Sequence, residues 1–536
     1  MFGAGTRTGR NQPENDMNIS LSHRTTLLVL LPALSTLLPA ATPCENLASL
    51  KLPYTTITAA QSVAAHGYTP PAPFPGAGPR GALAVVAATD LPAFCRVAAT
   101  IEPSRDSAIK FELWMPASGW NNKFMGIGNG GWAGSITYMS MGEPLTRGYA
   151  TASTDTGHEG NATDASFALG HPEKVIDFGY RSVHEMTLKA KAIVAAYYGH
   201  APKLSYWNGC STGGRQGLKE AQQFVEDYDG IVAGAPANFF THLSAQYVWI
   251  GQAIHDNPAA LIPSSKLPMI HAAVVRACDA LDGVKDGILE DPRRCDFDPK
   301  ALECKGADGP TCLTAPQADL VRRVYSPSIN PRTKQQVYPG LTRGSELSWG
   351  FGIGHVVAQP PPLATGVFKY ALLQDAGWDY AKFDFDADMA RVDQLDHGTI
   401  NAIDPDLRKF FGRGGKLLQY HGWTDQGISP LNSINYYSSV LEAAGGLGKV
   451  NDSYRLFMVP GMDHCGGGEG PNTFDSISVI EQWVEKGKAP ENMIASHITA
   501  GKVDRTRPLC AYPNVAAYSG SGSTDDAVNF ACAASK

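Results

Sequence analysis

The stretch that decides the fold is Leu204-Ser205-Tyr206-Trp207-Asn208-Gly209-Cys210-Ser211-Thr212-Gly213-Gly214. Its first four residues form a short apolar run that predicts a strand ending at Trp207, and residues 218–224 are helix-forming with an apolar face. Between them lies a Gly-x-Ser-x-Gly motif, residues 209–213. A strand, a turn with small residues on both sides of a serine, and a helix predict a nucleophile elbow. Such an elbow holds its serine in a strained backbone conformation and lifts the hydroxyl out of the sheet.

The serine motif needs this context, because Gly-x-Ser-x-Gly arises readily by chance in a glycine-rich chain. The chain has 56 glycines among 536 residues, and chance produces so short a pattern in such a chain about one time in two. The alternative interpretation is a glycine-rich turn with an incidental serine. The flanking strand and helix favour the elbow, with Ser211 as nucleophile and the backbone N–H of Thr212 as one oxyanion donor.

Candidates for the general base and its acid follow two later strand patterns. A serine hydroxyl is a weak nucleophile until a base takes its proton, and the base needs an orienting acid. In a sheet enzyme with this elbow, the acid and then the base follow the serine, on loops at the carboxyl ends of strands. Asp425 follows the apolar run 416–420, and His464 follows the run 454–459. We therefore expect a triad of Ser211, Asp425 and His464.

Two neighbouring residues are alternatives for these roles. Asp463 adjoins the predicted base, where its side chain is expected to point elsewhere. His421 precedes the predicted acid and could be the base only with a different acid. Most of the other histidines are expected to be surface or core residues.

A second oxyanion donor is expected from the glycines that follow the strand pattern at 123–128. The sequence there is Asn129-Gly130-Gly131, and glycine lets a backbone N–H approach a ligand closely. Gly131 is the first choice and Gly130 the second. A plain turn is the alternative.

Strand and helix patterns alternate at both ends of the chain. Strand patterns occur at 111–115, 123–128, 204–207, 231–236, 416–420 and 454–459, and an amphipathic helix at 474–486. The rhythm breaks between about 237 and 408, a segment too long for a structureless loop. We expect an α/β-hydrolase fold, a mostly parallel sheet with helices on both faces. Residues 42–236 and 409–536 would form the catalytic domain, and residues 237–408 an inserted lid domain.

The first 41 residues are typical of a secretion signal with an N-terminal extension. Arg24 precedes a short apolar run that ends in small residues, with cleavage expected near Ala40 or Ala41. Residues 1–16 fit neither part of a signal, so Met17 is a candidate start. The alternative is a membrane anchor, for which the run is short. The predicted location is secreted or periplasmic, without stable membrane association.

The ten cysteines agree with export, because an even number in an exported chain predicts up to five disulfides. Spacing alone suggests, without proving, the pairs Cys278–Cys295, Cys304–Cys312 and Cys510–Cys532. Cys210 directly precedes the predicted nucleophile and Cys465 directly follows the predicted base, so a bridge between them would hold the two catalytic groups within reach. The alternative leaves Cys210 as a buried free thiol. A zinc site is disfavoured, because the chain has no Cys-x-x-Cys pair.

An acidic loop in the expected lid suits a calcium ion. Hard oxygen ligands would come from the carboxylates of Asp279, Asp282 and Asp286 and the carbonyls of Val284 and Ile288. The loop is not an EF-hand, because no twelve-residue loop ending in glutamate is present. The alternative is a solvated acidic turn. A calcium ion here would stabilise the lid and take no part in the chemistry.

Together these motifs resemble the tannase and feruloyl esterase family, which also includes the hydrolase of mono(2-hydroxyethyl) terephthalate. The resemblance covers about Cys44 to Cys532. It rests on residues 209–214, Asp425, His464-Cys465 and the loop 279–288. It implies the Ser211–His464–Asp425 triad, a Cys210–Cys465 bridge, a calcium-bearing lid, and four further bridges, of which Cys44–Cys95 did not follow from spacing.

The resemblance also implies the substrate class, small esters of aromatic acids, with Trp132 and Ile428 as candidates to line the pocket. In the terephthalate ester hydrolase we expect an aromatic residue three positions after the catalytic acid, where this chain has Ile428. Hydroxycinnamate esters are therefore the first choice and gallate esters the second. The mechanism would be acyl transfer through an acyl-enzyme, with no organic cofactor.

Other classes of protein remain to be separated from an esterase. The same scaffold could be a non-catalytic binding protein for polyphenols or polysaccharides, or a peptidase, which no sequence feature favours. A net charge of −7 and a pI near 6.1 give no basic patch and argue against nucleic acid as a partner. The sequence leaves the oligomeric state open.

Overall fold

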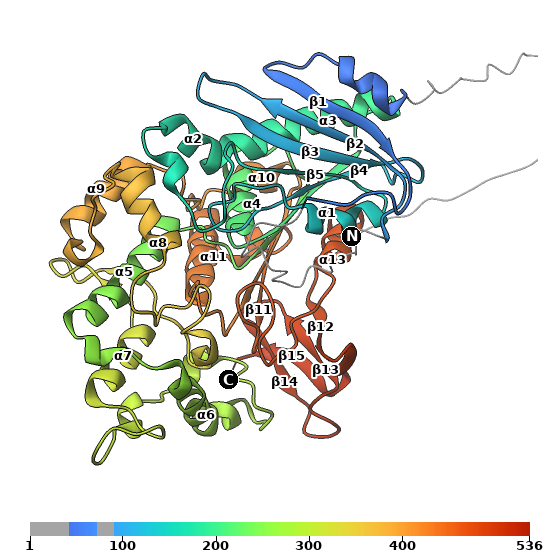
Figure 1. Cartoon of the computed structure of the whole chain (residues 1–536). Coiled ribbons are helices and arrows are strands. Elements are labelled where there is room, and N and C mark those ends of the chain that lie inside the picture. The colour runs from blue at the N-terminus through green and yellow to red at the C-terminus, as the bar shows by residue number, and fades with distance from the viewer. Residues whose placement is uncertain (1–41, 72–89, 536) are drawn as a thin grey trace, which may run out of the picture. The chain divides into compact units, whose positions relative to one another are not determined.

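A nine-stranded sheet lies at the centre of the computed structural model, which describes residues 42–71 and 90–535 (Figure 1). In spatial order its strands are β1 (Thr55–Val63), β2 (Phe94–Ile101), β3 (Ile109–Pro116), β5 (Ala150–Thr154), β4 (Lys123–Ile127), β6 (Leu204–Cys210), β7 (Gly230–Gly234), β10 (Lys416–Gly422) and β11 (Tyr454–Val459). The pairs from β1 to β5 are antiparallel, and the six strands from β5 to β11 are parallel. The mostly parallel sheet of the α/β-hydrolase type is confirmed.

Successive side chains of each strand point to opposite faces of the sheet, so both faces present apolar side chains. Helices cover both of these faces. In β10, Leu417 packs into one core cluster and Leu418 into the other. The first cluster includes apolar side chains of α3 (Ser182–Tyr198), α4 (Thr212–Gln223) and α11 (Pro430–Ala444). The second includes side chains of α1 (Tyr138–Thr146) and α13 (Ser476–Lys486). The helix predicted at 474–486 is α13, which buries Ile477, Ile480 and Trp483.

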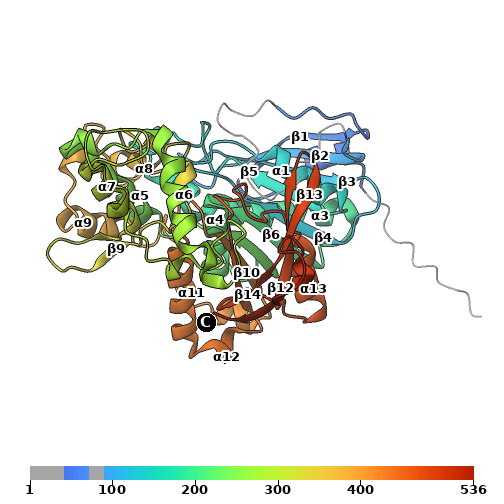
Figure 2. The ribbon, with the colours of Figure 1, turned by 90° about the horizontal axis from the view of Figure 1, so that it is seen from below.

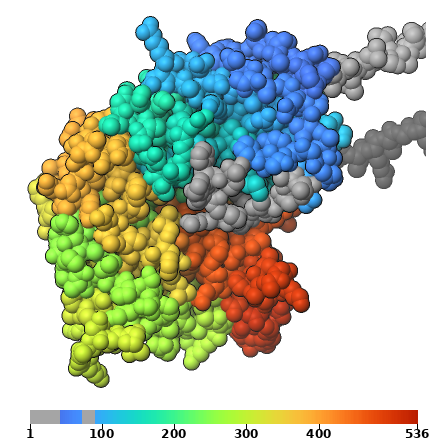
Figure 3. Space-filling view, in the orientation of Figure 1, coloured from blue at the N-terminus to red at the C-terminus, as the bar shows by residue number. Residues whose placement is uncertain are grey.

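The segment between β7 and β10 forms a largely helical insertion beside the sheet (Figures 1 and 2). Its elements are α5 (Phe240–Asp256), α6 (Leu267–Cys278), α7 (Ala315–Tyr325), β8 (Ser328–Ile329), β9 (Gln336–Tyr338), α8 (Pro362–Gly366), α9 (Ala387–Asp396) and α10 (Arg408–Gly412). The insertion has apolar clusters of its own, one of which surrounds Trp349. In the space-filling view its residues, coloured green to orange, cover a continuous area (Figure 3).

Four further strands follow the catalytic part of the chain as two antiparallel pairs. They are β12 (Asn492–Thr499) with β13 (Lys502–Cys510), and β14 (Asn514–Tyr518) with β15 (Phe530–Ala534). Two short helices complete the main elements, α2 (Pro172–Ile176) and α12 (Leu447–Val450). The predicted secretion signal lies outside the described residues. Among those residues, no helix is long and apolar enough to span a membrane.

Five disulfides cross-link the chain and use all ten cysteines. They are Cys44–Cys95, Cys210–Cys465, Cys278–Cys295, Cys304–Cys312 and Cys510–Cys532. The three pairs suggested by spacing are confirmed. The Cys210–Cys465 bridge, expected beside the predicted site, and the Cys44–Cys95 bridge, implied by the family resemblance, are confirmed as well. Five disulfides indicate that the chain folds in an oxidising environment.

Candidate active site

Ser211 lies in a sharp turn between β6 and α4, with φ +63° and ψ −121°. A non-glycine residue with positive φ is strained, and the surrounding backbone holds it there. Its N–H donates to the carbonyl of Gly234 at 3.0 Å, and its own carbonyl accepts from Ala237 N–H at 3.1 Å. Gly234 is the last residue of the neighbouring strand β7 and Ala237 follows it by three residues, so the sheet fixes the turn that presents the serine.

The elbow is tighter than the sequence predicted, because β6 runs on to Cys210 and α4 begins at Thr212. The prediction had the strand ending at Trp207 and the helix-forming residues at 218–224. Packing between the strand end and the first helical turn explains the difference. A Cβ on Gly209 would lie 2.6 Å from the carbonyl carbon of Gly213, so only glycines permit this close crossing.

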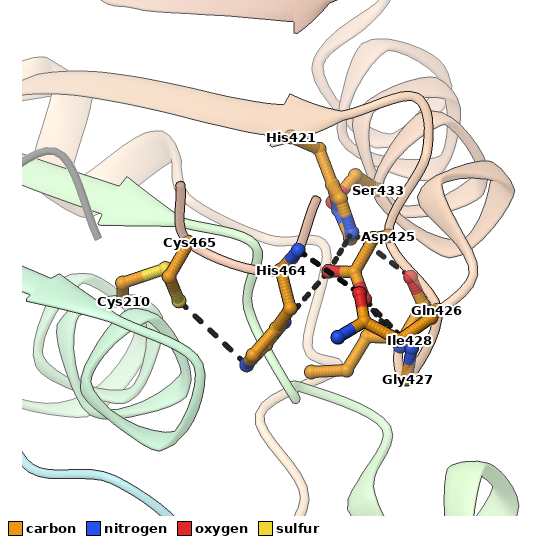
Figure 4. The surroundings of a disulfide bond; sticks show 9 residues. All are labelled: Cys210, His421, Asp425, Gln426, Gly427, Ile428, Ser433, His464 and Cys465. Carbon is orange, nitrogen blue, oxygen red and sulfur yellow. Dashed lines mark hydrogen bonds and ion pairs between the residues drawn. A yellow bond between two sulfur atoms is a disulfide. The ribbon is translucent and has the colours of Figure 1, made fainter. Parts of the chain in front are cut away.

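Asp425 and His464 meet at the carboxyl ends of β10 and β11 (Figure 4). Nδ1 of His464 lies 2.7 Å from Oδ2 of the fully buried Asp425. The other oxygen, Oδ1, accepts the N–H groups of Gly427 and Ile428 at 2.9 and 2.8 Å. Burial alone would raise the pKa of Asp425, but the charge of His464 and hydrogen bonds from both neighbouring imidazoles hold that pKa well below its usual range. The acid is therefore an ionised acceptor for the base.

The Cys210–Cys465 disulfide brings the base loop to the elbow across 255 residues. The two Cα atoms are 6.0 Å apart, and each cysteine is the chain neighbour of a catalytic candidate. Nε2 of His464 lies 3.6 Å from Sγ of Cys465. Within the described residues the Ser211 hydroxyl makes no hydrogen bond, and its approach to the imidazole of His464 stays a prediction.

The two predicted oxyanion donors belong to one hydrogen-bonded unit. The hydroxyl of Thr212 donates to the carbonyl of Gly131 at 2.7 Å, and Gly213 N–H donates to the carbonyl of Asn129 at 2.8 Å. Gly131 has φ +54°, and a Cβ there would lie 2.1 Å from the carbonyl oxygen of Ala162. No hydrogen bond among the described residues uses the N–H of Gly131 or of Thr212. Both remain available to an oxyanion, the second at the start of a helix, where the dipole favours negative charge.

Trp132 and Ile428, the expected pocket residues, are both buried in this structure. The ring centroid of Trp132 lies 4.7 Å from that of Phe178 and 5.1 Å from that of Phe240. The indole N–H donates to the carbonyl oxygen of Leu363, in the insertion, at 2.9 Å. Trp132 therefore ties the oxyanion loop to the insertion. Ile428 holds the predicted acid, Asp425, through its backbone N–H. The contact of these two side chains with substrate stays a prediction.

The alternative acid, Asp463, points to the insertion. Its two carboxylate oxygens accept the hydroxyls of Thr424 and Ser348, each at 2.9 Å. The alternative base, His421, is fully buried and shares the carboxylate of Asp425 with His464. Sequence reasoning did not anticipate this sharing. The spacing of four residues between His421 and Asp425, across a strand end, was the only available signal.

A third histidine joins the insertion to the loop of the base. In His271, which belongs to α6, Nδ1 lies 3.0 Å from Oε2 of Glu346 and Nε2 lies 2.9 Å from Oε2 of Glu469. Glu469 follows His464 by five residues. Burial alone would lower the pKa of His271, but the two carboxylates raise it to about 9. The charged imidazole of His271 thus links the insertion to the loop that carries His464.

The acidic loop has the donor set of a calcium site. It is held by turns in which Asp279 accepts Gly287 N–H at 3.0 Å and Asp282 accepts Val284 N–H at 2.9 Å. Burial and the charge of Asp286 raise the pKa of Asp279 and of Asp282. A divalent cation would relieve this crowding of carboxyl groups, while Arg507 partly balances Asp286 through an ion pair. The oxygen donors are of the kind that calcium prefers, but the three carboxylates do not converge within 4.8 Å of one another, so calcium binding stays a prediction.

The family model, the related sequences and the solved structures that this chain resembles all indicate one protein family. Residues 95–533 match the family model described as tannase and feruloyl esterase. The chain is 39% identical to an esterase of Xanthomonas campestris pv. campestris over 94% of this chain and 93% of the relative. It is 34% identical to feruloyl esterase B of Aspergillus niger over 84% of this chain and 88% of that protein. The crystal structure of feruloyl esterase B from Aspergillus oryzae superposes with a TM-score of 0.84 at 31% identity, covering 91% of this chain and 99% of that one.

Proposed function

Because the chain belongs to the tannase and feruloyl esterase family and is a carboxylic ester hydrolase, we propose that it cleaves esters of hydroxycinnamic acids through an acyl-enzyme. One observation carries the mechanism. The acid–base pair of Asp425 and His464, joined at 2.7 Å, is tied by a disulfide to the residue before the strained Ser211. A binding protein has no need to keep these three groups on converging loops.

The proposed reaction has two steps. Oγ of Ser211 attacks the ester carbonyl as Nε2 of His464 takes its proton, and the resulting oxyanion is held by the N–H groups of Thr212 and Gly131. The alcohol leaves with the proton that His464 returns. Water, activated by the same imidazole, then releases the aromatic acid and restores Ser211. Asp425 keeps Nδ1 protonated throughout and stabilises the imidazolium.

The choice of hydroxycinnamate rests on the relatives. Those named feruloyl esterase B are similar along most of their length, and one of them shares the fold at a TM-score of 0.84. Gallate esters are the second candidate, because the family model is described as covering tannase as well. A terephthalate half-ester ranks third, since Ile428 stands where that activity leads us to expect an aromatic residue.

We also propose a structural calcium ion in the loop 279–288. Its ligands would be the carboxylates of Asp279, Asp282 and Asp286 with the carbonyls of Val284 and Ile288, and the ion would supply only local cohesion to the insertion. Export of the chain, as a secreted or periplasmic enzyme, is proposed from its N-terminal pattern and its five disulfides.

The deciding experiment compares methyl ferulate, methyl gallate and mono(2-hydroxyethyl) terephthalate as substrates of the wild type and of Ser211→Ala. We expect turnover of methyl ferulate by the wild type and none by the variant. Turnover of another ester alone would reassign the acid. If the folded wild type cleaves none of these esters, nor a simple nitrophenyl ester, the chain binds such compounds without hydrolysing them and the triad is vestigial.

A further inference from the structure

His421 is an imidazole in full contact with the catalytic acid but outside the predicted triad (Figure 4). It is the sixth residue of β10, and its side chain has no exposed surface. Nε2 lies 3.2 Å from Oδ2 of Asp425 and 3.0 Å from the carbonyl oxygen of Ile428. Nδ1 lies 2.7 Å from the hydroxyl of Ser433, which is also fully buried.

These partners fix which nitrogen carries the proton. Nε2 faces two acceptors, a carboxylate and a carbonyl, so it must be the donor. Nδ1 is then the acceptor for the hydroxyl of Ser433, which can rotate to donate. With these partners both ring nitrogens are hydrogen-bonded, as those of a buried histidine must be.

We propose that His421 is a positioning residue, which holds Oδ2 of Asp425 against Nδ1 of His464 throughout the reaction. The inference deepens the esterase function proposed above and rests on it. His421 does not touch the reacting atoms and acts only through the acid.

The geometry explains why the acid needs such a support. Asp425 lies three residues beyond the end of β10, on a loop, whereas His421 lies within the strand and pairs in register with Met458 of β11. The N–H groups of Gly427 and Ile428 hold only Oδ1. Without His421, the imidazole of the base would be the sole donor to Oδ2.

Two substitutions separate positioning from simple filling of space. In His421→Gln the terminal amide can reach Asp425 about as far as Nε2 did, whereas the shorter amide of His421→Asn stays near Ser433. We expect H421N to lower kcat for methyl ferulate about tenfold to a hundredfold at nearly unchanged KM. H421Q should recover most of that loss.

The pH profile gives a readout that a structural role would not move. The titratable side chains facing Asp425 are His464, His421, His355, Tyr247, Tyr338 and Asp463. If the carboxylate is misaligned, the imidazolium of His464 is less stabilised, so the acid limb of kcat/KM should move to lower pH in H421N and stay in place in H421Q. An unmoved limb, a limb moved to higher pH, or equal rates in the two variants would overturn the proposal.

Two controls keep the result interpretable. His184→Asn breaks a matched imidazole–carboxylate contact, 2.6 Å from Asp227 and away from the site, and should leave kcat and the profile unchanged. If H421N does not fold, Ser433→Ala removes only the partner of Nδ1 and should still lower kcat at constant KM; an unchanged kcat would count against the proposal. Ser211→Ala runs in parallel. Residual activity there sinks the esterase mechanism itself, whereas a silent S211A with an unaffected H421N sinks only the role of His421.

Discussion

Nε2 of His464 lies 3.6 Å from Sγ of Cys465, so a disulfide touches the nitrogen that we propose takes the serine proton. The ring is held between this bridge and the carboxylate of Asp425, which binds its other nitrogen at 2.7 Å. The bridge is therefore part of the wall around the base as well as a cross-link.

Removing the Cys210–Cys465 bridge should lower both the free energy of unfolding and kcat. By loop length, a bridge across 255 residues stabilises by about 5.5 kcal/mol, and the Cys304–Cys312 bridge across 8 residues by about 2.5 kcal/mol. We expect C210S/C465S to lose more stability in urea than the control C304S/C312S, and to lose kcat as well. Equal kcat in the two folded double variants would show that the bridge does not position the base.

Asp425→Asn should nearly abolish turnover while the fold survives. The amide presents an N–H or a weaker acceptor to His464 and favours the wrong tautomer of the base, a change that cost about 10⁴-fold in kcat in a serine protease. Steady-state kinetics with methyl ferulate would measure it, with the far-ultraviolet spectrum as a check on folding. A loss below tenfold would point to another acid.

Gly131→Ala should be more damaging than its size suggests. The new methyl would meet the carbonyl of Ala162 at 2.1 Å, and the residue has φ +54°, so the loop that offers the oxyanion donor must shift. Gly119→Ala is the matched control, because it also has positive φ (+70°) but nothing within 4 Å of an added Cβ. We expect a fall in kcat of about a hundredfold for G131A and none for G119A; similar rates would exclude Gly131 as a donor.

The contact of His271 with Glu346 and Glu469 should make stability depend on alkaline pH. The folded pKa of His271, about 9, exceeds its unfolded value, so its contribution is complete below about pH 6.5 and is lost as pH rises through about 9. We expect the charged form of His271 to stabilise the fold by about 2 kcal/mol, a value reduced because solvent screens its contact with the exposed Glu469. Urea midpoints of the wild type and His271→Gln should differ at pH 6 and converge near pH 10. A constant difference would mean that no charge is involved.

Calcium removal should loosen the insertion without entering the chemistry. EGTA is expected to lower the Tm of the wild type, and added Ca²⁺ to restore it, because the ion offsets the crowding of Asp279, Asp282 and Asp286. Asp282→Asn should have the lower Tm from the start and respond less to either treatment. No response of the wild type to EGTA or to Ca²⁺ would leave the loop as a solvated turn.

Much of the catalytic half of the fold could be predicted because its signals are local. The strand patterns at 416–420 and 454–459 correspond to β10 and β11, and the loops that follow them carry Asp425 and His464. Parallel strands bring their carboxyl ends to one edge, so chain order alone indicated which loops would meet. The predicted start of α4 was wrong, because tertiary contacts determine where this helix begins. Glycines disfavour a helix, but a Cβ added to Gly214 would lie only 2.4 Å from the carbonyl oxygen of Gly234, and this close packing overrides propensity.

Other features had no local signal. The edge strand β1 alternates partly exposed and exposed side chains over much of its length, without a buried apolar face. The sequence offered His421 only as an alternative base, because its contact with Asp425 depends on the rotamer of a side chain four residues away. The burial of Trp132 beneath the insertion likewise follows from a contact 231 residues distant, with Leu363.

The bridge between Cys210 and Cys465 has a consequence for how the protein is made. At about 5–20 residues per second, the ribosome needs roughly 13 to 50 s to add the 255 residues that separate them. During that time Cys210 is a lone thiol, while both partners of Cys278–Cys295 and of Cys304–Cys312 emerge after it. A wrong bridge between Cys210 and one of these later cysteines would have to rearrange by thiol–disulfide exchange before Cys465 could pair. The nucleophile meets its base only when nearly the whole chain exists, so a truncated nascent chain has no working active site.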